Sequence, residues 1–206
     1  MNPLNSIAGT IIGGIVLAIF LVLITMGDHV VGAEPGISII IWLHVLSGIT
    51  WIGLLYYFNF VQVPALTDAA NDDGGPGGAG ITKYVAPKAL FWFRWAALVT
   101  WLTGAAFLLH RGQLADAFAL GMLANSVNPA YFLTIGIGAW LGTIMLFNVW
   151  GLIWPNQKKI LGLVEASADE IAKARKVALM ASRSNTLMSI PLVMSMVSAG
   201  GHGFFM

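Results

Sequence analysis

A histidine inside an apolar stretch is the residue of this sequence with the clearest capacity for chemistry. His44 lies well in from one end of the apolar segment 37–63. A charged side chain in hydrocarbon costs roughly 2.5 kcal/mol or more on insertion scales. Neutral imidazole avoids most of this cost and is a good ligand for a metal or a haem iron. We therefore predict that His44 is a ligand of a metal or of a haem iron. The alternative is that its side chain forms a simple hydrogen bond to a neighbouring helix.

The other histidines lie at the ends of apolar segments. His110 and His202 are candidate second ligands, and interfacial or solvated positions explain them as well. His29, beside Asp28 in a loop, is expected to be solvated. The chain has no cysteine, which excludes disulfides, thiolate metal sites and covalently attached c-type haem. Any metal must therefore be held by histidine, carboxylates or the backbone.

Polar residues form a second group inside the apolar segments. Arg94 lies among aromatic residues, so it either snorkels to the lipid headgroups or faces the helix bundle and pairs with an anion. Trp51 and Gln62 share one helix face with His44, because eighteen residues make five helical turns. The predicted binding residues of this second group, for a haem propionate or an acidic substrate, are Asn59, Gln62, Arg94, Asn148 and Arg183.

Membrane-spanning helices must position these residues. The chain has 206 residues, of which 58% are hydrophobic and 9% are charged, whereas soluble domains average about 25% charged. We predict a single all-α transmembrane domain, a polytopic helical bundle. Five spans are expected at about 7–26, 37–63, 87–109, 130–154 and 179–200, with a flexible glycine-rich linker at 68–82 and a short interfacial helix over 113–125.

Prolines and capping residues set the expected helix ends. Pro64 is expected to stop the second span, Pro87 to open the third and Pro155 to close the fourth. Ser167 and Glu170 fit a capping box at the start of a last, long helix. The first apolar run has span length and no preceding Lys or Arg, so we interpret it as a retained span and not as a cleaved signal peptide.

The distribution of Lys and Arg predicts the orientation. The segment 156–180 and the connector between the second and third spans are basic, whereas Arg111 alone falls in the loops of the other side. The positive-inside rule then places the N-terminus in the cytoplasm and the C-terminus in the periplasm of a bacterial inner membrane. All four histidines would lie toward the periplasmic side. A net charge of +1 offers no case for nucleic-acid binding.

Four sequence blocks resemble a known family. They are Trp42–Gln62, Ala86–Trp95, Gly142–Lys158 and Ala181–Pro191. In this order they are similar to the membrane domain of the bacterial membrane-bound urate hydroxylase, the urate oxidase N-terminal family. His44 followed by Trp51 and Gly53 also resembles small histidine-bearing membrane bundles, namely the membrane protoporphyrinogen oxidase and copper-resistance families.

The resemblance implies a membrane redox protein. His44 would ligate haem b, with His110 or His202 as the second ligand and Trp51 beside it. The family also carries a C-terminal cytochrome c domain with a Cys-x-x-Cys-His haem site, which a chain without cysteine does not contain. Electrons would therefore leave through a separate cytochrome c, a quinone or a partner subunit.

Other function classes stay open at this stage. The chain could be a non-catalytic subunit of a larger respiratory, photosynthetic or monooxygenase complex, or a homo-oligomer in the lipid bilayer. A small-molecule or metal-ion transporter is a third reading, although five spans show no evident inverted repeat. The sequence contains no Walker loop, dinucleotide fingerprint, HExxH motif or nucleophile elbow.

Overall fold

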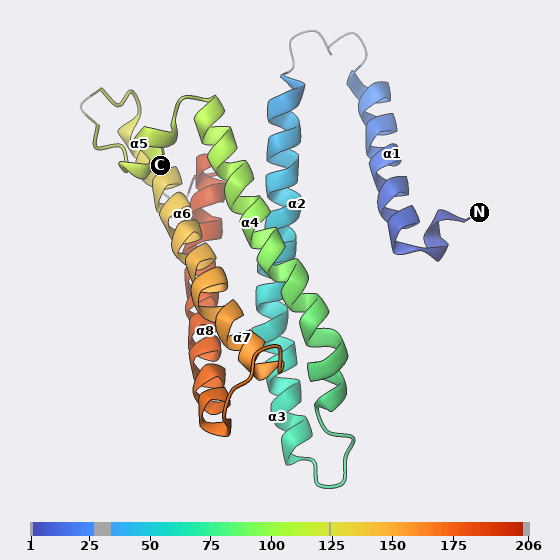
Figure 1. Cartoon of the computed structure of the whole chain (residues 1–206). Helices are drawn as coiled ribbons and strands as arrows, with labels where there is room; N and C mark the ends of the chain where they lie inside the picture. The colour runs from blue at the N-terminus through green and yellow to red at the C-terminus, as the bar shows by residue number, and fades with distance from the viewer. Residues whose placement is uncertain (1, 27–33, 124, 204–206) are drawn as a thin grey trace. The chain divides into compact units, whose positions relative to one another are not determined.

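The computed structural model describes residues 2–26, 34–123 and 125–203. These residues are largely helical and contain no strand, which confirms the all-α prediction (Figure 1). The chain divides into two compact units, residues 1–38 and 39–206. The first unit contains a short 3-10 helix, Pro3–Asn5, and the helix α1, Ile7–Met26.

The second unit contains the remaining helices, including most of α2. Several of them continue into one another through π-helical turns. The helix bounds are α2 Pro35–Tyr57, η3 Phe58–Gln62, α3 Val63–Asn71, η4 Ile81–Val85, α4 Ala86–His110, α5 Leu114–Phe118, α6 Pro129–Phe147, η5 Asn148–Ile153, α7 Trp154–Ile160 and α8 Ala168–Ala199.

Four helical stretches are long and apolar enough to cross a membrane: Ile7–Ile24, Gly36–Asn71, Ile81–His110 and Pro129–Ile160. The structure is therefore compatible with that of a membrane protein. The expected fifth span lies in α8, which is not among these four stretches. Within α8, Ser189 is 0% exposed and Leu187 is 71% exposed, but the polar Arg183 is exposed as well.

Three π-helical turns carry the helices past their prolines. Pro64, Pro87 and Pro155 each follow such a turn by two residues. The residue just before each proline donates its N–H five residues back, as Val63 does to the carbonyl of Phe58. A proline cannot donate to the carbonyl four residues back, and its ring crowds that carbonyl. A wider turn before the proline therefore lets the helix continue.

This arrangement corrects the helix ends expected from the prolines. The second helix continues to Asn71, the fourth segment continues to Ile160, and the third begins before Pro87. Helical residues consequently occupy both edges of the expected linker 68–82, leaving 72–78 outside helices. In the segment 113–125, the helical part is α5 alone, and its Ala117 is fully buried.

The central core of the second unit lies where α2, α4, α6, η5 and α8 meet. Figure 1 shows α6 and α8 side by side, with α4 crossing in front of α2. The largest fully buried side chains there include Leu55, Phe93, Met145 and Val149. The rings of Phe58 and Phe93 meet edge to face, 5.4 Å apart. This core lies between the two ends of the bundle, and the candidate site residues at one end differ from those at the other.

The predicted capping box at the start of α8 is formed. The Ser167 hydroxyl accepts from the N–H of Glu170 at 3.3 Å, and the Ser167 N–H donates to Glu170 Oε2 at 2.9 Å. Lys159 of α7 donates to the other carboxylate oxygen at 3.4 Å. The hydrogen bond from the Ser167 backbone, then that from its side chain, then Lys159 hold the pKa of Glu170 below its usual value of 4.5.

This depressed pKa predicts a pH dependence of the helix start. Because the folded protein favours the carboxylate, its stabilising effect is present above the usual pKa and is lost as the pH falls through the depressed value. We expect the protection factors for hydrogen exchange in the first turn of α8 to fall below pH 4.5 in the wild type. Glu170→Gln should remove this pH dependence, and Asp169→Asn serves as the control. An unchanged pH profile in Glu170→Gln would contradict the prediction.

Candidate functional site

His44 is held by a hydrogen bond to the neighbouring helix. Its Nδ1 lies 2.8 Å from the backbone carbonyl oxygen of Thr100 on α4. A carbonyl can only accept, so Nδ1 carries the proton and donates it. The lone pair of the neutral ring is therefore on Nε2. A second bond links the same two helices, because the Thr100 hydroxyl donates to Ser47 at 3.0 Å.

The imidazole of His44 occupies space that a side chain at position 104 would fill, so glycine is required there. A Cβ atom built on Gly104 would lie 2.9 Å from Cε1 and 3.2 Å from Nδ1 of His44. Real Cβ contacts are essentially never that short. The ring therefore rests against the backbone of α4. Thr100, Thr103 and Gly104 together form a seat for the imidazole, one helical turn deep.

His44 lines an apolar cavity of about 430 Å³, here called the histidine cavity. Gly104, Gly138, Gly142 and Gly200 leave its walls without side chains at four places. Trp51 lies two helical turns from His44 and also lines the cavity. Its indole N–H is buried and has no hydrogen-bond partner in the described part of the chain. An occupant with an acceptor at that depth would satisfy it.

A second cavity of about 600 Å³ lies toward the opposite end of the bundle. It is here called the amide cavity, because the side chains of Gln62, Asn71 and Gln157 line it. Each of the three π-helical turns contributes at least one residue to its wall. Its other polar lining residues are Thr67, Thr82, Arg175 and Ser182.

Polar side chains between α6 and α8 bond one another in the interior. Asn148 donates to Asn185 at 2.8 Å, and Asn185 donates to the carbonyl of Met145 at 3.0 Å. Tyr56 and Ser189 form a further bond of 3.0 Å between α2 and α8. Asn148 thus has a structural partner and lines neither cavity. This position does not support the predicted role of Asn148 in binding a haem propionate or a substrate.

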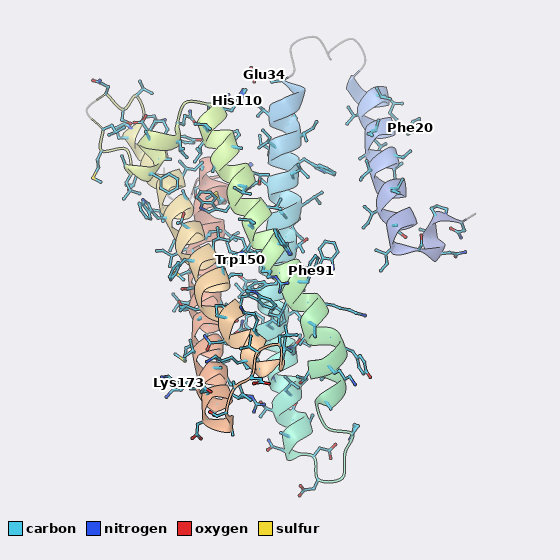
Figure 2. All side chains as sticks on the ribbon, in the orientation of Figure 1. Phe20, Glu34, Phe91, His110, Trp150 and Lys173 are labelled. Carbon is cyan, nitrogen blue, oxygen red and sulfur yellow. The ribbon has the colours of Figure 1, made fainter. Side chains whose placement is uncertain are left out.

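The two arginines of the predicted site lie apart. The Arg94 guanidinium stacks on Trp154, 3.7 Å from the ring centroid, and lines neither cavity. In Figure 2 the neighbouring Phe91 lies beside Trp150, toward the basic end of the bundle. Arg183 is exposed on the outer side of α8. The residue that brings a positive charge to the amide cavity is Arg175.

The remaining histidines do not join His44 at its cavity. His110 ends α4 and is exposed, at the far end of that helix from Phe91 (Figure 2). His202 is exposed just beyond α8. His29 lies outside the described residues. Within the described ranges no three His, Asp or Glu residues gather in a group that could hold a metal ion.

The described candidate residues therefore fall into two groups at different levels of the bundle. His44 and Trp51 line the histidine cavity, whereas Gln62 lines the amide cavity. Asn59 donates a hydrogen bond of 2.8 Å to Ser182, which also lines the amide cavity. Arg94 is six residues, or about 9 Å of helix rise, from Thr100 on the same helix. The structure does not bring the histidines and the arginines into one compact site.

Comparison with known proteins bears on the C-terminal part of the chain. Residues 117–203 match the model of the family described as urate oxidase N-terminal. Over this segment, which is less than half of the chain, the sequence is similar to that family. No curated protein matches the chain, and no solved structure does.

The matched segment covers α6, η5, α7 and α8. It includes Asn148, Asn185 and Ser182, and it supplies one wall of each cavity. His44 lies outside the matched segment. The case for His44 therefore rests on its own geometry.

The sequence reasoning missed the residues that hold His44 and those that line the amide cavity. Thr100, Thr103 and Gly104 are spaced as neighbours on one helix face, in a span that is otherwise apolar. Small and polar residues at this spacing indicate a helix contact, and this signal could have marked them. Nothing in the sequence shows that Arg175 and Ser182 line a cavity with Gln62, because these residues are far apart in the chain.

The tight contact at Gly104 predicts a sensitive position. In Gly104→Ala the new methyl group must displace the His44 ring, and overpacking of this kind costs about 1–3 kcal/mol. We expect a lower midpoint of thermal unfolding in detergent. Gly53→Ala is the matched control, because a Cβ there meets nothing within 4 Å. Equal midpoints for the two variants would contradict the seat described for His44.

Proposed function

We propose that the chain is a membrane redox protein, related to urate hydroxylase, whose histidine cavity holds haem b on His44. The hydrogen bond between Nδ1 of His44 and the Thr100 carbonyl is the observation that carries this proposal. This bond fixes the tautomer and leaves the lone pair of Nε2 available to a metal, because metal-binding histidines typically donate their other ring N–H to a carbonyl or carboxylate.

The residues present fit such a group in three respects. The cavity is apolar, as the porphyrin face requires, and the glycine positions leave room for a flat ring against the helices. His44 supplies an imidazole nitrogen free of protein partners in the hydrogen bonds described. Trp51 supplies a buried N–H with no partner, which can donate to a carboxylate of the bound group.

Each lining residue then has a defined task. His44 binds through Nε2, and the Thr100 carbonyl orients the ring and raises its basicity by accepting from Nδ1. Gly104 allows the imidazole to approach α4. The apolar wall excludes water and so lowers the local polarity. Haem b supplies a one-electron carrier when it is bound.

A second ligand from the protein is not needed for this proposal. Met196 also lines the cavity and carries a thioether, a known haem donor. His110 and His202, which we predicted from the sequence, lie at exposed positions instead. Electrons would pass to a separate cytochrome c or to a quinone in the lipid bilayer, at the inner membrane of a bacterium.

The haem proposal predicts a defined loss in one variant. Purified wild type should show a b-type reduced-minus-oxidised spectrum and a positive pyridine haemochrome assay. His44→Ala should retain less than about a tenth of the wild-type haem, since a lost ligand costs 10-fold or more in affinity. His202→Ala is the matched control and should retain the wild-type haem content.

Two outcomes would overturn this proposal. Well-folded wild-type protein without haem after full loading would favour the alternative, a non-catalytic subunit of a larger membrane complex. Stoichiometric partner proteins in the same preparation would strengthen that alternative. Equal haem in His44→Ala and wild type would place the haem elsewhere.

A further inference from the structure

A residue that lines the amide cavity and a second residue close to its wall have buried acceptors without a partner in the described part of the chain. Gln62 Oε1 and Asn59 Oδ1 are buried and have no hydrogen-bond partner among the described residues. The two residues are neighbours on the same helix, about one turn apart. Leaving a buried acceptor unpaired costs free energy. The interior of this cavity therefore favours an occupant that donates hydrogen bonds.

The deep wall of the cavity is apolar and aromatic. Phe58 and Phe93 line it and are almost fully buried, with Leu90 and Ile153 beside them. These residues belong to the helical stretches that are apolar enough to cross a membrane. A flat ring fits against such aromatic and aliphatic side chains better than a hydrated group does.

Charge lies only at the rim of the cavity. Arg175 is the one charged residue among the lining residues that the structure describes, and its side chain is exposed. A fully charged occupant placed deep inside would leave its charge unpaired, which is costly in an apolar surrounding. The deep part of the cavity therefore suits a neutral ring that bears hydroxyl donors.

Ser182 adds a polar group that can adapt to either partner. Its hydroxyl oxygen accepts from Asn59 at 2.8 Å. Its own hydrogen can still be donated to an oxygen of an occupant. With Gln62 it makes a donor and an acceptor facing the same space, which is the pairing that a phenolic hydroxyl group uses.

We propose that the amide cavity binds the head group of a lipid-soluble hydroquinone. One phenolic hydroxyl donates to Gln62 Oε1, and the ring packs against Phe58 and Phe93. The inference concerns binding alone and includes no electron-transfer step. It goes beyond the haem proposal and does not depend on it, because the cavity and its unpaired acceptors are independent of His44.

The test measures binding of a short-tailed benzohydroquinone to the full chain in detergent by equilibrium dialysis. Gln62→Leu removes the unpaired acceptor and should weaken binding about tenfold, which is about 1.4 kcal/mol. Gln113→Leu makes the same chemical change outside the cavity and should bind like the wild type. Haem content is measured in the same samples, so that each proposal can fail separately.

A second measurement needs no variant. A photoreactive analogue of the same hydroquinone should label wild-type protein in 58–62 or 178–182, and unlabelled hydroquinone should protect these segments. Labelling confined to 100–104 or 192–200 would overturn the inference, since these segments face the histidine cavity. It would also be overturned if urate, a water-soluble anion, displaced the hydroquinone completely, or if Gln62→Leu bound it as tightly as the wild type.

Discussion

The structure of the second unit depends on one constraint: polar groups inside apolar helices must find partners within the chain. Lipid offers no hydrogen bonds, so each unsatisfied group costs several kcal/mol. The interhelical bonds follow from this. His44 reaches the Thr100 carbonyl, Asn148 reaches Asn185, and Tyr56 reaches Ser189. These bonds join α2, α4, η5 and α8, while large apolar side chains occupy many exposed positions.

The same constraint explains why the exceptions are informative. The buried polar atoms without a partner include Trp51 Nε1, Gln62 Oε1 and Asn59 Oδ1. Trp51 lines the histidine cavity, Gln62 lines the amide cavity, and Asn59 contacts its wall through Ser182. Three further atoms of this kind among the described residues, Asp116 Oδ1, Ser126 Oγ and Trp150 Nε1, belong to residues that line neither cavity. Trp51 and Gln62, which line the two cavities, are therefore the residues that favour an occupant.

The π-helical turns link backbone chemistry to the second cavity. Each turn precedes a proline by two residues, and all three regions line the amide cavity. A π turn widens a helix locally and shifts the side chains that follow it. Pro64, Pro87 and Pro155 thus each follow a turn that contributes residues to the wall of one cavity. Lys159 of α7, which pairs with Glu170 of α8 at 3.4 Å, is not among the lining residues of this cavity.

The sequence alone determined the all-α fold, the apolar helices and the capping box at Ser167, because composition and short-range hydrogen bonding depend on neighbouring residues. It also identified His44 as a candidate functional residue, because an ionisable side chain inside an apolar segment is costly. It could not place helix ends at Pro64 and Pro155, where a π turn overrode the local rule. Only the tertiary structure decided that Arg94 stacks on Trp154 and that Arg183 faces outward. It also decided that Gln62 shares a cavity with Arg175, because the packing of distant helices determines which residues meet.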